Sequence, residues 1–238
     1  MGLFRRAKQA DVVPDDAAVV AGSPTDAEVG GPTPGDGRSR GPWDVSEVPE
    51  RGKRVDLGPL WLPGREGMEL RMEIEKTSRL VTAAAVSLHG SALQLQVFAA
   101  PRTEGIWDDI RAEIAESVTK QGGSAEDVVG PFGRELLARV PIRTPEGRTG
   151  HRPARFIGHD GPRWFLRGVL TGRAAADEEA ARELEDVFAD VVVVRGQEAR
   201  PPRDLLPLTV PGGRRAPAAP PESAPDVLTR GPEITETR

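Results

Sequence analysis

Residues 155–172 read RFIGHDGPRWFLRGVLTG, with two apolar runs on either side of Asp160-Gly161. An Asp-Gly pair between hydrophobic segments is a strong signal for a β-hairpin, because a type I′ turn needs a positive φ at both central residues. With this pair at the centre of the turn, Phe156 lies opposite Phe165. Both faces of the hairpin are then largely apolar, which is typical of strands in the middle of a domain. We therefore predict that this hairpin forms the centre of the core.

Further strands are predicted where apolar and polar residues alternate. Residues 68–75 alternate between apolar and charged side chains, which indicates a strand with one buried and one solvated face. Residues 80–88 and 93–100 continue this sheet around a turn. Residues 134–142 show the same alternation after a Gly-Pro turn signal.

Helical periodicity replaces the alternation in two segments. Apolar residues recur every four positions across 106–118, and Thr103 is the expected N-cap of this helix. The second helix is expected to begin after Asp177. Its acidic residues, including Glu185, are expected to be solvated. Residues 191–194 form either a last strand or the buried end of this helix.

The order of these elements indicates the fold class. Strands are followed by a helix, further hairpins and a second helix, with no regular βαβ alternation. This order predicts an α+β fold, in which an antiparallel sheet built from hairpins carries two packed α-helices. The outline is similar to the Mog1/PsbP-like sandwiches, a resemblance of fold that implies no function.

Glycine and proline divide the chain into a core and two tails. The 27 Gly and 23 Pro are concentrated at the ends, so we predict a single domain over residues 41–208 between disordered tails at 1–40 and 209–238. Residues 41–66 are predicted to form extended arms whose tryptophans either anchor the arms on the core or line a ligand site. Residues 204–208, DLLPL, are expected to dock on the core.

Composition excludes several kinds of site. The chain contains no cysteine, which excludes disulfides, Cys-ligated metals and thiol catalysis and fits a reducing cytoplasm. The net charge of -5 gives no general attraction to a polyanion. No apolar run is long enough to span a membrane, and the N-terminus lacks the apolar core of a signal peptide. We therefore expect a cytoplasmic protein without a membrane span.

Common catalytic motifs do not occur in the sequence. It contains no P-loop, no Gly-x-Ser-x-Gly elbow, no His-Glu-x-x-His and no Rossmann fingerprint in a suitable context. The three histidines lack the spacing of metal ligands. His159 and Asp160 could form a general-base pair, but turn chemistry already explains both residues. We predict no cofactor, no metal and no catalytic residue, and we favour a protein that is not an enzyme.

Several short blocks of the sequence are distinctive. They are GPWD at 41–44, VDLG at 55–58, PG at 63–64, LQLQVFAAPR at 93–102, GIWD at 105–108, GPFG at 130–133, GPRWFLRG at 161–168 and DLLPL at 204–208. Together these blocks resemble an actinobacterial domain-of-unknown-function family, family 3710. The resemblance extends over residues 41–208 and implies a cytoplasmic protein with a compact domain between variable tails. It implies no activity and no site residue.

Three functions are compatible with the sequence. The first hypothesis is a non-enzymatic binding or adaptor module that engages a protein partner. The second is a nucleic-acid-associated protein that uses arginines and aromatic residues of the 155–167 hairpin, although Arg155 is expected on the opposite face from Arg167, against the clustering typical of such proteins. We favour the alternative that these arginines pair with helix carboxylates or extend their stems over apolar neighbours. The third is a hydrolase or transferase of unrecognised type. The sequence does not indicate an oligomeric state. The candidate ligand- or partner-binding residues are Trp43, Trp61, Arg102, Arg163, Phe165 and Arg167.

Overall fold

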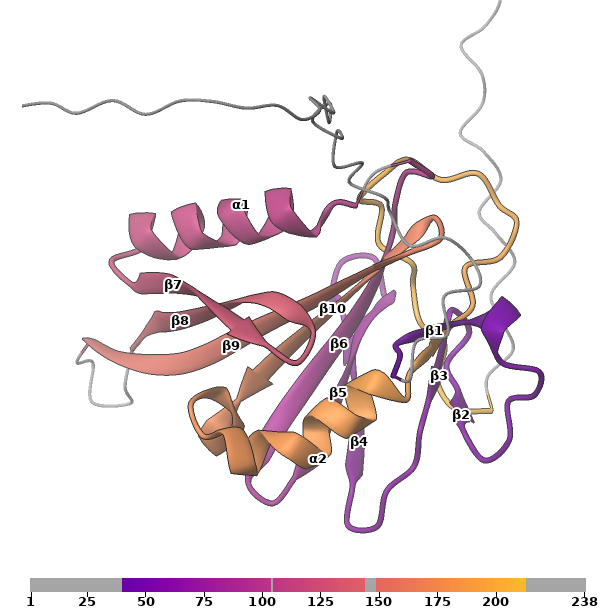
Figure 1. Ribbon diagram of the computed structural model, residues 1–238, viewed down its shortest axis with the longest axis horizontal. Coiled ribbons are helices and arrows are strands. Elements are labelled where there is room, and N and C mark those ends of the chain that lie inside the picture. Colours follow the sequence, from indigo (N-terminus) through magenta and orange to yellow (C-terminus); the bar gives the residue numbers. More distant parts are fainter. Residues whose placement is uncertain (1–39, 104, 144–148, 213–238) are drawn as a thin grey trace, which may run out of the picture. The chain divides into compact units, whose positions relative to one another are not determined.

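The structure of the protein is a computed structural model, which describes residues 40–103, 105–143 and 149–212. The tails predicted at 1–40 and 209–238 lie outside the described residues, apart from Arg40 and residues 209–212. The described residues form two sheets, in which most strand pairs are antiparallel, and two α-helices (Figure 1). This arrangement confirms the predicted α+β class. None of the helices in the described segments is long and apolar enough to cross a membrane.

The larger sheet contains seven strands in the order β4-β5-β6-β10-β9-β8-β7, and every neighbouring pair is antiparallel. Strands were predicted in the right places at 68–75, 80–88, 93–100 and 134–142, and the hairpin predicted at the centre does occupy the middle of the sheet. The strands are β4 (Glu69–Ile74), β5 (Val81–Leu88), β6 (Ser91–Ala99), β7 (Ser124–Gly130), β8 (Gly133–Arg143), β9 (Thr149–Gly161) and β10 (Trp164–Thr171).

The smaller sheet is formed by the arms and by a short strand after the second helix. Its order is β1-β11-β3-β2, with β1 (Trp43–Asp44), β2 (Val55–Asp56), β3 (Leu60–Leu62) and β11 (Val192–Val193). Residues 191–194 therefore contribute a strand, which decides between the two alternatives left by the sequence. A 3₁₀ turn, η1 (Val45–Glu47), follows β1.

The two helices cover opposite faces of the larger sheet (Figure 1). Helix α1 (Trp107–Lys120) packs on β7, β8 and β9, and it meets Phe165 of β10 through Trp107. Helix α2 (Glu178–Ala189) follows the 3₁₀ turn η2 (Gly172–Ala175) and covers the face that carries Leu166. Because neighbouring residues of a strand point to opposite faces, β10 supplies apolar side chains to both layers.

The central hairpin turns at a different place from the one predicted. Its turn is Pro162-Arg163, where Arg163 has a φ of 64°, and Phe156 pairs with Val169 instead of Phe165. Proline favours the first central position of a turn, and here this preference prevails over the Asp-Gly signal. The register shift is even, so each side chain stays on its expected face. The predicted faces of the hairpin are therefore right, although its predicted register is wrong.

Asp160 caps helix α1 from the neighbouring strand. Its carboxylate accepts hydrogen bonds from the backbone N–H of Ile106 at 2.8 Å and of Trp107 at 3.2 Å. The N-cap residue is Ile106, so the prediction of Thr103 as N-cap is wrong. Gly105 allows this close approach, because a Cβ at residue 105 would lie 2.5 Å from Asp160 Oδ2. Asp177, in contrast, caps α2 as predicted, accepting from Glu179 and Ala180.

Residues 203–209 fill the space where β5 and β6 part. The backbone N–H of Leu206 donates to Val97 O at 2.8 Å, and that of Leu208 donates to Val81 O at 2.9 Å. Both leucine side chains are buried in the main core. The segment thus replaces a strand pair at this end of the sheet.

Candidate functional site

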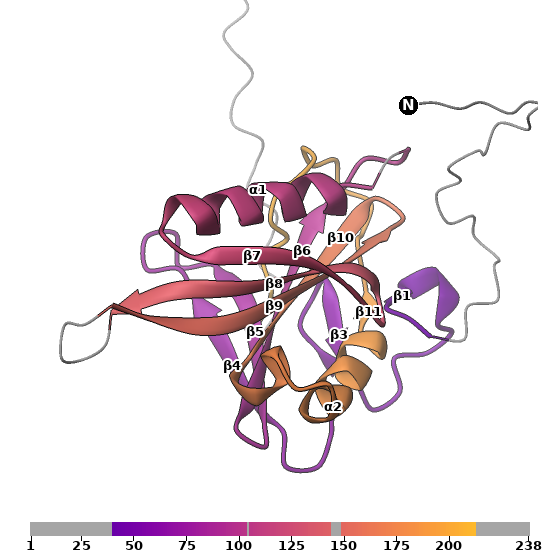
Figure 2. The same ribbon diagram turned by 60° about the vertical axis from the view of Figure 1, so that its left-hand side comes forward.

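The smaller sheet places Trp43 and Trp61 on the same face, on either side of Val192. Strand β11 lies between β1 and β3 (Figure 2). Trp43 pairs with Val192 in a parallel ladder, and Val192 pairs with Trp61 in an antiparallel ladder. Directly paired residues project from the same face of a sheet, so the three side chains form a row. Both tryptophans are half-buried, whereas Val192 between them is fully buried. We call the surface formed by Trp43 and Trp61 the Trp face.

The opposite side of the smaller sheet holds the Trp face in place. Asp44 projects inward, is buried, and accepts a hydrogen bond from Trp164 Nε1 at 2.7 Å. Its other oxygen accepts from the backbone N–H of Ser46 at 2.9 Å, at the start of η1. Because Asp44 is tied to the core, its neighbour Trp43 must point outward. Satisfied buried polar groups of this kind give a strand a defined position.

Arginines fasten the arms to the C-terminal end of α2. Arg40 pairs with Asp186 at 2.8 Å, and Arg65 pairs with Asp190. Arg54 Nε donates to the backbone carbonyl of Asp190 at 3.0 Å. The C-terminus of a helix carries partial negative charge, and α2 has no basic residue in its last turn. The arms therefore supply the cations that this helix end lacks.

A cavity of about 380 Å³ opens beside Trp43. Its charged groups are two arginines and two aspartates, so it has no excess of either charge. Gly41 sets the position of the indole, because a Cβ there would lie 2.6 Å from Trp43 and 2.4 Å from Ala189 O. The cavity can therefore accept a group that packs an apolar side against Trp43 and forms hydrogen bonds with the arginines and the aspartates. Its walls are formed by Arg40, Gly41, Trp43, Arg65, Asp186, Ala189 and Asp190.

The candidate residues outside the arms do not form a second patch with one another. Arg102 is exposed in the loop before α1, and Arg163 is half-buried and donates to Gly196 O at 2.9 Å. Phe165 is fully buried and stacks on Trp107, with ring centroids 5.6 Å apart. Arg167 lies over the Phe98 ring and bonds to Gln96, and burial lowers the pKa of its guanidinium. Phe165 is therefore not part of the accessible surface.

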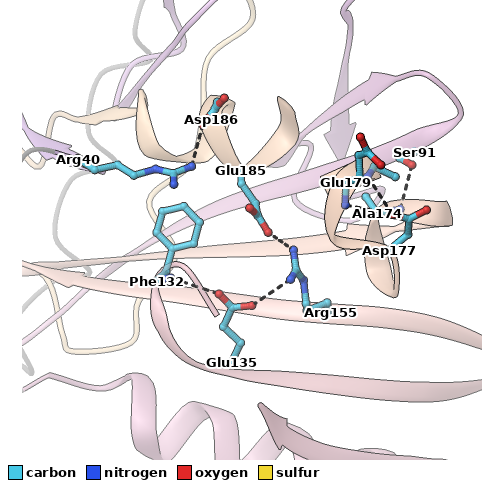
Figure 3. Close-up of polar contacts among 11 residues, drawn as sticks. Arg40, Ser91, Phe132, Glu135, Arg155, Ala174, Asp177, Glu179, Glu185 and Asp186 are labelled. Atoms are coloured by element: carbon cyan, nitrogen blue, oxygen red, sulfur yellow. Dashed lines mark hydrogen bonds and ion pairs between the residues drawn. The ribbon is translucent and has the colours of Figure 1, made fainter. Parts of the chain in front are cut away.

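A buried ion cluster joins β8, β9 and α2 (Figure 3). The sequence indicated that arginines of the hairpin pair with helix carboxylates, but it did not indicate the burial of Glu185 or the part of Glu135. Arg155 pairs with Glu185, and its Nη1 lies 3.6 Å from Glu135 Oε2, an ion-pair separation beyond hydrogen-bond length. Glu135 also accepts from the backbone N–H of Phe132 at 3.3 Å. Burial raises the pKa of Glu135, and the charge of Arg155 opposes this rise.

The expectation that Glu185 is solvated is wrong, because only 6% of it is exposed. The signal was present in the sequence: Glu185 lies four residues after Ala181 and three before Phe188, on the stripe that α2 buries. All three charged side chains are enclosed, and none of them lines the cavity beside Trp43. This arrangement suits a structural link between the sheet and α2.

The structure separates His159 from Asp160. The Asp160 carboxylate lies at the start of α1, whereas the His159 ring lies 5.9 Å from the Trp164 ring on the other face of the sheet. Neighbours in a strand cannot share a proton across the sheet, so these residues do not form a general-base pair. No group of three His, Asp or Glu residues within the described segments could hold a metal ion.

Comparison with known proteins gives a family but no activity. No curated protein matches this chain. A family model described as a protein of unknown function, DUF3710, matches residues 41–216, which include both sheets and both helices. The match also includes Trp43, Trp61 and the buried ion cluster. The chain therefore belongs to the DUF3710 family.

Proposed function

We propose that the protein is a non-enzymatic binding module that engages a protein partner through the Trp face. The observation that carries this proposal is the pair of half-buried tryptophans, held from beneath by Asp44 and bordered by a cavity of about 380 Å³. We propose the cytoplasm as its compartment, with which the lack of cysteine is compatible.

Tryptophan suits this function for two physical reasons. A single indole offers a large contact area, and tryptophan is enriched among the residues that dominate binding energy in protein interfaces. Trp43 and Trp61 are also attached to paired strands, so little conformational entropy is lost when a partner covers them. The Trp face is thus preorganised for binding.

The charges around the cavity favour a protein over a nucleic acid. Arg40 and Arg65 are already paired with Asp186 and Asp190, so they have no surplus positive charge to offer to phosphates. Nucleic-acid sites normally present a cluster of basic residues on one face. A peptide can instead bond to both the arginines and the aspartates.

The test compares three forms of the full-length chain as bait in lysate of the source organism. They are the wild type, the double variant Trp43→Ala/Trp61→Ala and the control variant Val129→Ala. Val129 is 90% exposed on β7, an edge strand of the larger sheet, so its truncation removes exposed apolar surface and leaves Trp43 and Trp61 unchanged. Bound proteins are quantified by mass spectrometry, and thermal unfolding confirms that each bait is folded.

We expect at least one protein to be retained by the wild type and by Val129→Ala and lost with the double variant. If every retained protein binds the folded double variant equally well, the Trp face is not the binding surface. If the only molecules retained at low salt are nucleic acids, the proposal is wrong, because phosphate contacts are strongest under that condition.

A further inference from the structure

The two edge strands of the larger sheet differ in their charges. β7 carries Glu126 and Asp127 as its only charged residues, and α1 packs beside it. β4, at the other border, alternates both signs of charge in the order Glu69, Arg71, Glu73. An edge strand presents unpaired backbone groups that can bind another strand. Like charges on β7 oppose the approach of a second β7, whereas β4 has no such uniform charge.

Two of the three charged side chains of β4 are available to a partner, while the third, Glu73, accepts a hydrogen bond from Gln94 Nε2 at 2.6 Å. The side chains of Glu69 and Arg71 are 69% and 73% exposed, and they pair with each other at 3.3 Å. Such an exposed ion pair contributes little and is easily exchanged for another. Ile74, at the end of the strand, is 54% exposed. The strand therefore combines unpaired backbone groups, exchangeable charges and exposed apolar surface.

The sequence of β4 is complementary to itself in an antiparallel pair. Registers centred on Leu70 or on Met72 place each Arg71 opposite a glutamate of the other copy, Glu69 in the first register and Glu73 in the second. The register between them, centred on Arg71, would bring two arginines together and is disfavoured. Opposite charges that face each other across a strand pair are favourable, so the charge pattern favours the registers centred on Leu70 and Met72 over the one centred on Arg71.

The other face of β4 is apolar and also matches itself. Met68, Leu70 and Met72 are half-buried and pack against the main core. In the register centred on Leu70, Met68 meets Met72 of the other copy and the two Leu70 side chains meet at the dyad. The apolar layer of one copy would then continue into that of the next, while the charged pairs lie on the solvent side.

We propose that the β4 edge pairs antiparallel with β4 of a second copy of this chain, joining two larger sheets into one across a two-fold axis. Such an interface is isologous, because each copy contributes the same surface. It involves one short strand from each copy, so the dimer is weak and its population depends on concentration. This proposal does not depend on the Trp face.

The test measures the dimer dissociation constant of the full-length chain by sedimentation equilibrium at low salt. Arg71→Glu turns β4 into a uniformly acidic edge, and we expect it to weaken the dimer about tenfold or more, because attractive cross-strand pairs become repulsive. Arg139→Glu is the matched control, since it makes the same charge change at an exposed residue of β8, inside the sheet. We expect the control to associate like the wild type.

A mixing experiment separates charge complementarity from any general effect of substitution. Glu69→Arg/Glu73→Arg makes a uniformly basic edge, which we expect to be as monomeric alone as Arg71→Glu. Mixing the basic and acidic variants should restore a dimer that contains one copy of each. A wild type that stays monomeric at the highest attainable concentration contradicts the proposal. So does a dimer that Arg139→Glu weakens as much as Arg71→Glu, or a mixture that stays monomeric.

Discussion

Asp160 and Asp177 perform the same task in two different environments. Each accepts backbone N–H groups at the start of a helix, but Asp177 belongs to its own helix, whereas Asp160 reaches α1 from β9. Burial raises the pKa of Asp160 despite the hydrogen bonds from Ile106 and Trp107. At exposed Asp177, the hydrogen bond from Ala180 and the pairing with Arg173 lower the pKa instead. The pKa of an aspartate that caps a helix is therefore raised at Asp160 and lowered at Asp177, because the surroundings of the two carboxylates differ.

We predict that Asp160→Ala destabilises the domain by about 1–2 kcal/mol, the usual effect of removing a helix cap. In this variant the backbone N–H groups of Ile106 and Trp107 lose their acceptor in a partly buried position. We therefore expect a loss near the upper end of this range. Urea unfolding measures the change. Glu126→Gln, an exposed substitution on β7, serves as the control, and an equal loss in both variants would contradict the capping role.

At the level of elements, α2 is held to the larger sheet by apolar contacts and by the Arg155 cluster. Two carboxylates face one guanidinium, so the cluster carries a net negative charge when all three groups are ionised. Removing the cation leaves two buried carboxylates close together, whereas neutralising Glu135 leaves one balanced pair. The two changes should therefore have very different consequences.

We predict that Arg155→Met lowers the free energy of unfolding by about 3–5 kcal/mol, the loss typical of a broken buried ion pair. Glu135→Gln should change it by much less, because Gln has the same shape and Arg155 still pairs with Glu185. Chemical denaturation of both variants at neutral pH provides the comparison. Similar losses in the two variants would show that packing, not charge, governs the cluster.

The raised pKa of Glu135 also predicts a pH dependence. The folded state holds this proton more tightly than the unfolded state, so the stabilising contribution is present below the ordinary glutamate pKa and is lost as the pH rises through the raised pKa. We expect this decrease in the free energy of unfolding in the wild type and a smaller decrease in Glu135→Gln, where the raised pKa of Asp160 still contributes. Denaturation curves measured across this pH range for both proteins check the difference, and parallel curves would contradict the assignment.

At the scale of the whole molecule, residues 203–209 connect the two sheets. Leu208 bonds to Val81 of β5, and the next residue, Thr209, donates to Leu57 O at 3.0 Å, beside the smaller sheet. The side chain of Leu208 is buried in the core that both sheets share. This one segment therefore covers one side of the core and links the larger sheet to the residues beside the smaller sheet, which carries the Trp face.

We predict that Leu208→Ala destabilises the domain by about 2–5 kcal/mol, because a large side chain is lost from a packed core. Val210→Ala, which truncates a residue with 46% exposure, should change stability by no more than about 0.5 kcal/mol. Thermal unfolding of both variants measures the contrast. Equal effects would show that this segment lies on the surface without closing the core.

Part of the candidate site was predictable from the sequence. Trp43 and Trp61 stood out as aromatic residues within segments rich in proline and glycine, and both lie on the Trp face. Their pairing around Val192 was not predictable, because residue 192 is distant in the chain and strands of two residues have no measurable alternation. The cavity depends on Asp186 and Asp190, which a helical pattern alone presents as ordinary solvated residues.

The α+β class, the main strands, both helices and the faces of the central hairpin could be predicted from the amino-acid sequence, because local periodicity reports which side chains are buried. The turn at Pro162-Arg163, the capping of α1 by Asp160 and the burial of Glu185 became apparent only in the folded protein. Each of these depends on a partner far along the chain. A contact between distant residues leaves no periodic trace in the sequence, because its free energy exists only once the chain has folded.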